Sequence, residues 1–124
     1  MQIHFKGTNY ELPPDVSELA KRKVEGLTKY LGKGKEHARA YVDLGKETLA
    51  HQNGRIWRAD INFDVDVDGD RYYAKAIEES IEKAIDTSVA ELGKELQTAQ
   101  KRRQGLARKG GSIIKSLMRG GLSA

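Results

Sequence analysis

Basic side chains, which can pair with phosphate groups, gather in two parts of the sequence. Residues 21–35, KRKVEGLTKYLGKGK, contain six basic side chains and one acidic side chain. Residues 101–124 contain seven basic side chains and no acidic one, whereas residues 36–100 contain more acids than bases. Such segregation of charge indicates an anionic partner that meets one side of the protein. RNA or DNA is a polyanion that these clusters can contact.

The spacing of the first cluster places several bases on one side of a helix. Apolar residues recur at intervals of three and four over residues 14–31, which predicts an amphipathic helix. At about 100° per residue, Arg22, Lys29 and Lys33 fall together beside the apolar stripe, and Lys23 lies nearer to the core. The first helix therefore carries a basic side stripe.

A second helix, predicted over residues 77–103, carries a matching stripe. Lys83, Lys94 and Lys101 fall within about 20° of one another, and Arg102 lies nearer to the core edge. Two such stripes on one face of a sheet would neutralise several phosphates. The residues that we predict to bind RNA are Arg22, Lys23, Lys29, Lys33, Lys83, Lys94, Lys101, Arg102 and Arg103. The alternative is that these bases form ordinary solvated helix surfaces, some paired with acids on the same helix.

Catalytic and metal-binding patterns are weak in this sequence. There is no cysteine, and His4, His37 and His51 fall on different elements without ligand spacing. Residues 64–70, DVDVDGD, resemble the start of a calcium-binding loop, but Lys75 stands where that loop requires a bidentate glutamate. No nucleophile stands beside a base, and no carboxylate pair has an apolar background. We therefore expect neither an enzyme, nor a cofactor, nor a metal site.

The elements that must position the basic stripes alternate between strand and helix periods. Strands with one apolar face are predicted over residues 2–6, 38–45, 55–67 and 71–75, in addition to the two helices. Asn-Gly and Asp-Gly dipeptides flank the third strand, as expected for hairpin turns. The order β-α-β-β-β-α predicts an α+β fold in which two helices cover one face of a four-stranded sheet.

Length and composition indicate one domain followed by a tail. The chain has 124 residues, enough for one hydrophobic core but not for two. We assign residues 1–103 to an α/β domain and residues 104–124 to a basic, Gly-rich, mobile tail. No stretch is long and apolar enough to span a membrane and no leader segment is recognisable, so we expect a cytoplasmic protein. One alternative is that the tail anchors weakly to a membrane surface through SIIKSLMR.

Two segments of the predicted helices, together with the strand pattern, resemble a known family. ELPPDVSELAKRKVEGLTKYL and SIEKAIDTSVAELGKEL are similar to the ribosome hibernation-promoting factor / ribosome-associated translation inhibitor family. The resemblance covers residues 1–103 and implies a fold like that of double-stranded-RNA-binding domains. It also implies a short form, without the C-terminal dimerisation domain of the long members.

The resemblance implies binding to the small ribosomal subunit through its rRNA, along the mRNA channel and over the tRNA sites. Such binding would inhibit translation and stabilise idle ribosomes during stress. It implies no small-molecule substrate and no membrane, and we expect a monomer. Matched to the family pattern, Arg22, Lys23 and Lys29 stand at basic positions of the first helix, and Lys94 and Arg102 at basic positions of the second.

The sequence departs from the family pattern at several of its basic positions. Gly26, Gln97 and Thr98 occupy places where the family usually carries lysine or arginine, and Glu91 reverses a usual charge. These departures bear on how tightly the protein would bind RNA and on which of its side chains would contact the RNA. The extra bases in residues 101–103 and in the tail could compensate for them.

Two other functions remain open from the residues themselves. One is a general structured-RNA-binding domain without preference for the ribosome. The other is a protein-interaction regulatory module that uses the polar face of the sheet around Arg58, Asp60 and Asn62. The salt dependence of binding separates these two functions, because RNA binding dominated by phosphate contacts weakens steeply as salt is added.

Overall fold

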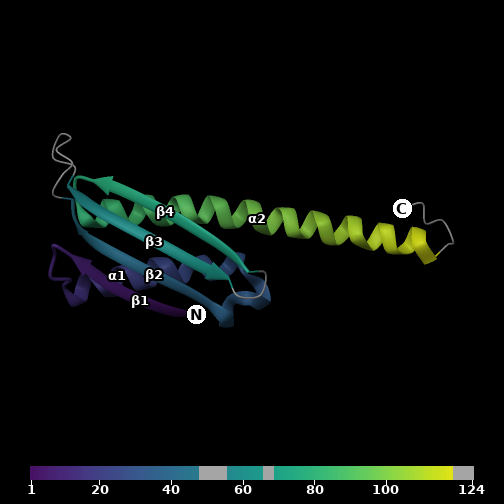
Figure 1. The fold of residues 1–124 in the computed structure, drawn as a ribbon, viewed down its shortest axis with the longest axis horizontal. Coiled ribbons are helices and arrows are strands. Elements are labelled where there is room, and N and C mark those ends of the chain that lie inside the picture. The colour runs from purple at the N-terminus through teal and green to yellow at the C-terminus, as the bar shows by residue number, and fades with distance from the viewer. Residues whose placement is uncertain (48–55, 66–68, 119–124) are drawn as a thin grey trace.

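The computed structural model describes residues 1–47, 56–65 and 69–118, with side chains as far as residue 105 except that of Lys33. The strands are β1 (Gln2–Thr8), β2 (Ala38–Lys46), β3 (Trp57–Val65) and β4 (Asp70–Glu78). The helices are α1 (Pro14–Glu25) and α2 (Ile81–Met118), and two 3-10 helices, η1 (Gly26–Tyr30) and η2 (Gly32–His37), connect α1 to β2. The predicted order β-α-β-β-β-α is confirmed (Figure 1).

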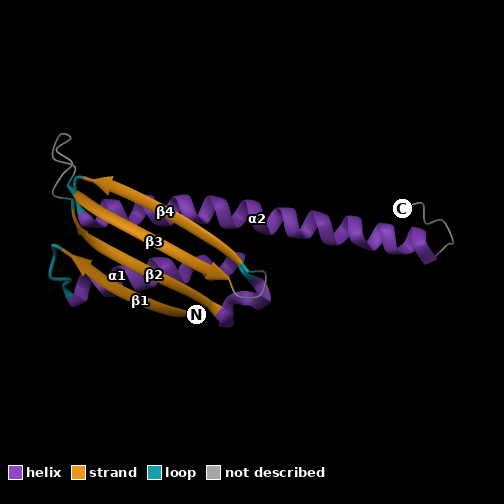
Figure 2. Ribbon diagram, viewed as in Figure 1, coloured by secondary structure: helices purple, strands orange, loops and turns teal. Residues whose placement is uncertain are grey.

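The strands form one mixed sheet in which the spatial order β1-β2-β3-β4 follows the sequence. β1 runs parallel to β2, whereas the β2-β3 and β3-β4 pairs are antiparallel. A parallel pair requires a crossover connection, which the helical segments between β1 and β2 supply. Both α1 and α2 lie on one face of the sheet and leave the other face open (Figure 2). The predicted fold class is therefore confirmed.

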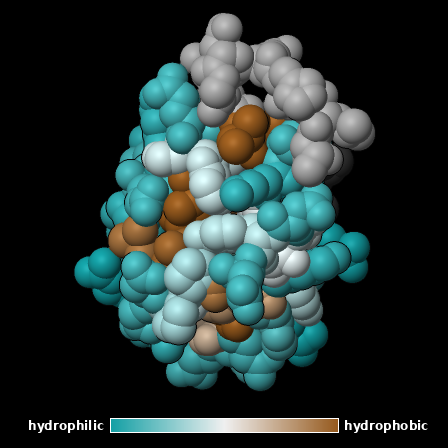
Figure 3. Space-filling view, turned by 90° about the vertical axis from the view of Figure 1, so that its left-hand side faces the viewer, coloured by the Kyte–Doolittle hydropathy of each residue, from teal (hydrophilic) through white to brown (hydrophobic). Residues whose placement is uncertain are grey.

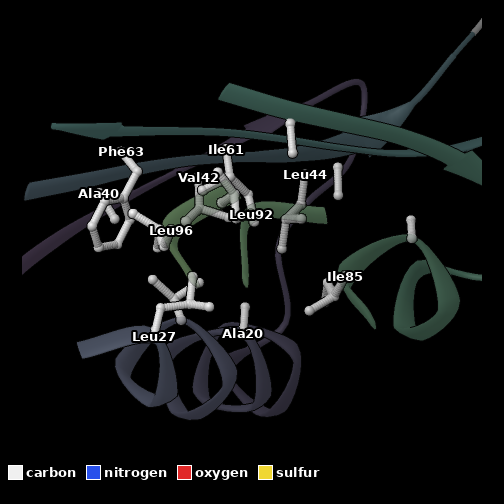
Figure 4. Close-up of a cluster of buried hydrophobic side chains, with 14 of the residues drawn as sticks. Ala20, Leu27, Ala40, Val42, Leu44, Ile61, Phe63, Ile85, Leu92 and Leu96 are labelled. Atoms are coloured by element: carbon white, nitrogen blue, oxygen red, sulfur yellow. The ribbon is translucent and has the colours of Figure 1, made fainter. Parts of the chain in front are cut away.

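Alternating residues of the strands bury one face of the sheet against the helices. In β3, Ile61 and Phe63 are fully buried, while the polar residues between the apolar ones lie on the open face. Removing such apolar side chains from water is the main stabilising contribution to the fold. The centre of this core, where the sheet meets both helices, is formed by Ala20, Leu27, Ala40, Val42, Leu44, Ile61, Phe63, Ile85, Leu92 and Leu96 (Figure 4).

The first helix ends earlier than its periodicity predicts. α1 ends at Glu25, and the chain continues as η1 with i to i+3 hydrogen bonds, such as that from the Leu31 N–H to the Thr28 carbonyl at 3.0 Å. Gly26 has a low helix propensity. In addition, the Thr28 hydroxyl donates to the Glu25 carbonyl at 2.8 Å and so competes for a backbone acceptor at the helix end.

The second helix begins later and ends later than predicted. It begins at Ile81, because Ile77 belongs to β4 and the Ser80 hydroxyl accepts a hydrogen bond from the Lys83 N–H at 3.1 Å. It continues to Met118, so the predicted helix end at Arg103 is wrong. Extending an existing helix adds one hydrogen bond per residue, whereas a separate short helix would have to nucleate.

The length of α2 carries its C-terminal part beyond the sheet. Its 38 residues span about 57 Å at 1.5 Å per residue, and the C-terminal part projects away from the sheet (Figure 1). At the opposite end of the molecule, hydrophilic residues predominate and apolar residues form small patches between them (Figure 3).

Two predicted features lie outside the described residues. They are residues 66–68 of the segment that resembles a calcium-binding loop, and the predicted Asn53-Gly54 turn.

Candidate nucleic-acid interface

A groove of about 310 Å³ lies between α1, η1 and α2 on the helical side of the molecule. α1 and η1 form one wall and α2 forms the other. Lys23 and Lys29 belong to the first wall and Lys94 to the second, so three of the nine predicted RNA-binding residues are brought together. The complete lining consists of Lys23, Gly26, Leu27, Lys29, Tyr30, Val89, Ala90, Gly93, Lys94 and Gln97.

Lys29 and Lys94 are the two lysines of this groove that face solvent. Both residues are exposed, and neither forms an ion pair with another described residue. The Lys29 ammonium lies over the Tyr30 ring, 5.1 Å from its centroid, which holds the charge near the groove by a cation–π contact. Two unneutralised ammonium groups on facing walls are suited to binding phosphate oxygens.

The change from α-helix to 3-10 helix explains why Lys29 lies near Lys23 rather than beside Arg22. A 3-10 helix turns about 120° per residue instead of about 100°. From Glu25 onward this rotates Lys29 by about 80° relative to the helical-wheel prediction. Lys29 therefore lines the groove, whereas Arg22 is exposed outside it.

Gly93 lies where the two walls of the groove approach each other. This glycine is buried within α2, and a Cβ atom placed on it would lie 3.6 Å from Leu27 Cδ2 and 3.8 Å from Tyr30 Cε2. A small residue at this position lets η1 pack closely against the helix. The sequence shows Gly93 only as a cost in helix propensity, because the residues that pack against it are distant in the chain.

We predict that Gly93→Ala raises the free energy of unfolding by about 0.5–1 kcal/mol. Alanine has the higher helix propensity, and its methyl group would make ordinary van der Waals contacts with Leu27 and Tyr30. Urea unfolding monitored by circular dichroism measures the change. Gly93→Leu is the matched variant and should lower stability, because its larger side chain would overpack the contact. Destabilisation by both variants would contradict the packing described here.

Two of the predicted RNA-binding lysines are engaged in ion pairs. Lys23 Nζ lies 2.5 Å from Asp86 Oδ1, which links α1 to α2, and Lys83 Nζ lies 3.6 Å from Glu78 Oε2. The Lys23 pair is partly exposed, so it contributes at most about 1 kcal/mol to stability. Lys83 lies outside the groove, near the start of α2. These acids partly neutralise both lysines, and their positions depend on the tertiary fold.

A second groove, of about 600 Å³, lies between α2 and the start of β4. Arg102, Arg103 and Lys94 line it, together with Arg71 from β4. The Arg103 guanidinium donates a hydrogen bond to the Tyr30 carbonyl at 3.2 Å, so this side chain ties α2 to η1. Arg103 therefore has a structural role that the basic pattern did not indicate.

The remaining predicted residues are not gathered at the first groove. Lys101 is exposed on α2 and lines neither groove. The side chain of Lys33 lies outside the described residues. The basic surface therefore centres on Lys29 and Lys94, with Arg102 on the other side of α2.

The gap that Gly26 leaves in the basic pattern lies on the rim of the first groove. Gly26 is exposed, has φ −61° and ψ −19°, and has no atom within 4 Å of the position that a Cβ would occupy. A lysine fits this backbone and this space. We predict that Gly26→Lys strengthens binding to a phosphate-rich partner by up to about tenfold at 0.1 M salt, because one more phosphate is neutralised.

Filter binding to ribosomal RNA at several salt concentrations measures the effect of Gly26→Lys. Gly105→Lys adds the same charge at an open position of α2 outside both grooves and is the matched control. Equal effects of the two substitutions would show that only net charge matters and would contradict a localised site.

Two chemical features of the described residues are the lack of a metal-binding cluster and the raised pKa values of two tyrosines. Among the described residues, no group of three or more His, Asp or Glu side chains is placed to hold a metal ion. Burial raises the pKa of Tyr10, and a hydrogen bond to Asp60 raises the pKa of Tyr73 to about 12. Both shifts keep phenols neutral and activate neither as a base. What the surface offers is cationic binding groups.

No helix in the described part of the chain is long and apolar enough to cross a membrane.

Comparison with curated protein sequences finds no match. Among solved structures, the Protein Y N-terminal domain from Thermus thermophilus is similar, with 23% identity and a TM-score of 0.64, covering 79% of this chain and 98% of that one. A ribosomal subunit interface protein from Coxiella burnetii is also similar, with 17% identity and a TM-score of 0.58, covering 85% of this chain and 99% of that one.

These structural similarities concern the fold, and the family follows from the sequence. Residues 3–104 match the family described as Sigma 54 modulation protein / S30EA ribosomal protein. The match spans the sheet, α1 and the part of α2 that packs on the sheet, including both walls of the groove. The chain therefore belongs to the Sigma 54 modulation protein / S30EA ribosomal protein family.

Proposed function

We propose that this protein is a non-enzymatic ribosome hibernation factor that acts in the cytoplasm. It binds the rRNA of the small ribosomal subunit in the mRNA channel and over the tRNA sites, inhibits translation and stabilises idle ribosomes. The observation that carries this proposal is the pair of lysines, Lys29 and Lys94, on facing walls of the helix groove of a chain from this family. Neither has an ion-pair partner among the described residues.

The geometry favours recognition of RNA shape through its phosphates. Lys29 and Lys94 are point charges without the paired donors of arginine, so they suit phosphate oxygens better than base edges. Folded RNA is read mainly through its backbone and shape where its bases are paired. The groove therefore supports binding to folded rRNA without a requirement for base contacts.

The similar structures support the ribosome as the partner. One of them is a ribosomal subunit interface protein, and both are covered almost completely by this chain. The long α2 also fits this proposal, because a projecting helix extends the protein along a channel. The rRNA that lines such a channel would contact the helix groove and the basic side chains of α2 together.

Sedimentation through sucrose gradients tests the proposed function. Purified protein is mixed separately with small subunits, large subunits and an unrelated RNA duplex at physiological salt. We expect sedimentation with small subunits and reduced initiation in a reconstituted translation assay. Equal affinity for the unrelated duplex would instead support a general RNA-binding domain, and absence of binding to small subunits would contradict the proposal.

The basic C-terminal segment extends the proposed contact. Residues 104–124 contain four bases and no acid, and α2 carries the first part of this segment away from the sheet. A chain that ends at Arg103 keeps both grooves and lacks these charges. We expect the binding of this shorter chain to small subunits to depend less steeply on salt. The slope of the logarithm of the binding constant against the logarithm of the salt concentration should become less negative by about 0.9 for each phosphate that the chain no longer neutralises.

A further inference from the structure

The open face of the sheet carries a row of residues that crosses all four strands. His4 of β1 pairs in register with Tyr41 of β2, Tyr41 with Asn62 of β3, and Asn62 with Tyr73 of β4. All four residues are exposed. The helices lie on the opposite face, so this row is separate from the two grooves (Figure 2).

Two of these residues present unusually large exposed rings. Tyr41 is 41% exposed and Tyr73 is 50% exposed, and they are the only exposed large hydrophobic residues in the described part of the chain. Tyrosine is enriched at binding interfaces, because its ring is apolar while its hydroxyl can stay hydrogen-bonded. Their position in one row indicates a surface that receives flat, apolar groups.

Neighbouring groups hold both rings in place. The His4 ring stacks on Tyr41, with the centroids 5.1 Å apart and the planes inclined by 13°. The Tyr73 hydroxyl donates a hydrogen bond to Asp60 at 2.5 Å, and this bond raises the pKa of Tyr73. Fixed rings lose little conformational entropy when a partner binds, so they provide a preorganised surface.

The next row across the sheet consists of Lys6, Asp43, Asp60 and Lys75, in register from β1 to β4. The two carboxylates already have partners, because Arg58 pairs with both, at 3.4 Å and 3.0 Å. Asp43 also accepts a hydrogen bond from Thr8 at 2.7 Å.

The two lysines at the ends of this row remain available to a partner. Lys6 and Lys75 are exposed and form no ion pair with the described residues. Arg58 supplies one positive charge against the two carboxylates, so Lys6, Lys75 and Arg58 together leave this part of the face with a net charge of +1. A polyanion would therefore meet a small excess of positive charge, with both carboxylates already held by Arg58.

The spacing of the two rows matches the two parts of a nucleotide. Neighbouring strands lie about 4.8 Å apart, and residues two apart on a strand are separated by about 6.7 Å. The aromatic row and the lysine row are thus about 6.7 Å apart across the whole sheet. Bases that stack on the aromatic row would place their phosphates within reach of the lysine row.

We propose that the open face of the sheet binds single-stranded nucleic acid, with bases stacked on Tyr41 and Tyr73 and phosphates paired with Lys6 and Lys75. Aromatic side chains on a sheet are a general way to bind unpaired bases. A protein partner fits less well, because lysine and aspartate are depleted at protein interfaces relative to the rest of the surface. This site is independent of the proposed ribosome function and would let the protein contact two RNA segments at once.

Fluorescence anisotropy with labelled oligo(U) and oligo(A) tests this proposal on the full-length chain. The double variant Tyr41→Ala/Tyr73→Ala should bind both oligonucleotides more weakly, by roughly 5- to 150-fold for each ring removed. The variants Tyr41→Phe and Tyr73→Phe keep the rings and should retain most of the affinity. Circular dichroism checks that all variants remain folded.

A variant of the other face separates this proposal from the ribosome function. Lys29→Glu/Lys94→Glu changes the helix groove and should weaken oligonucleotide binding much less than the double tyrosine variant does. Oligonucleotide binding that is absent, or that is unchanged in Tyr41→Ala/Tyr73→Ala, would overturn the proposal. Binding abolished only in Lys29→Glu/Lys94→Glu would overturn it as well, because the helix groove would then be the sole nucleic-acid site.

Discussion

Replacing Lys29 and Lys94 by glutamate is expected to lower the affinity for the small ribosomal subunit by about 100-fold or more at 0.1 M salt. Two phosphates left without a lysine partner account for about 60-fold under these conditions. Each glutamate also adds repulsion between the groove and the RNA backbone. Both positions are exposed, so the substitutions should leave the fold unchanged. Sedimentation with small subunits across a protein titration measures the reduction in affinity.

The matched control for this double variant is Lys21→Glu/Lys35→Glu. Both lysines are exposed, neither lines either groove, and the change in net charge is the same. We expect these substitutions to weaken binding by less than tenfold through long-range electrostatics. If the two double variants weakened binding equally, binding would depend on overall charge and the groove would not be the site.

Replacing Phe63 by alanine is expected to lower the free energy of unfolding by about 3–5 kcal/mol. Phe63 is 0% exposed and lies near the C-terminal end of β3, in register with Ala40 of β2 and beside Leu96 of α2 (Figure 4). Alanine would leave a cavity where α2 packs on the sheet, and domains of this kind are stable by only about 5–15 kcal/mol. Guanidinium unfolding followed by circular dichroism measures the decrease in stability.

The graded control for Phe63→Ala is Phe63→Leu. Leucine keeps most of the buried apolar volume, so its cost should be clearly smaller than that of alanine. Because α2 carries Lys94, the alanine variant should also reduce ribosome binding where it is partly unfolded. A decrease below about 1 kcal/mol for Phe63→Ala would contradict the position of this side chain in the core.

The fold could be predicted from the sequence because its strong signals are local. Alternation in β3 and the apolar spacing of α2 each follow from neighbouring residues, and the structure buries Ile61, Phe63, Ile85 and Leu92 as those patterns require. The short connections of the last three strands leave antiparallel pairing as the natural arrangement. Element ends were less predictable, since Ser80 and Gly26 compete with the longer helical pattern.

The candidate site was only partly predictable because it depends on contacts between distant residues. The pattern singled out Lys29 and Lys94, which the fold does bring to one groove. It could not show that Asp86 pairs with Lys23, or that the Tyr30 carbonyl accepts a hydrogen bond from Arg103. These partners are separated by dozens of residues in the chain.

A local change of helix type also altered the predicted surface. The helical wheel assumed about 100° per residue as far as residue 31. The 3-10 segment after Glu25 moves Lys29 away from Arg22 and toward Lys23. A helical wheel has no means of detecting this change, because it assumes a uniform turn and still places Leu27 and Leu31 on the apolar side, where the structure buries them.

Binding of small-subunit rRNA in the groove between α1, η1 and α2 is tested most directly by a cryo-electron microscopy structure of the protein on the small ribosomal subunit. We predict rRNA phosphate oxygens within ion-pair distance of both Lys29 Nζ and Lys94 Nζ, with the groove facing the RNA. A complex in which this groove faces solvent, or in which both lysines contact only ribosomal proteins, would contradict the proposed site.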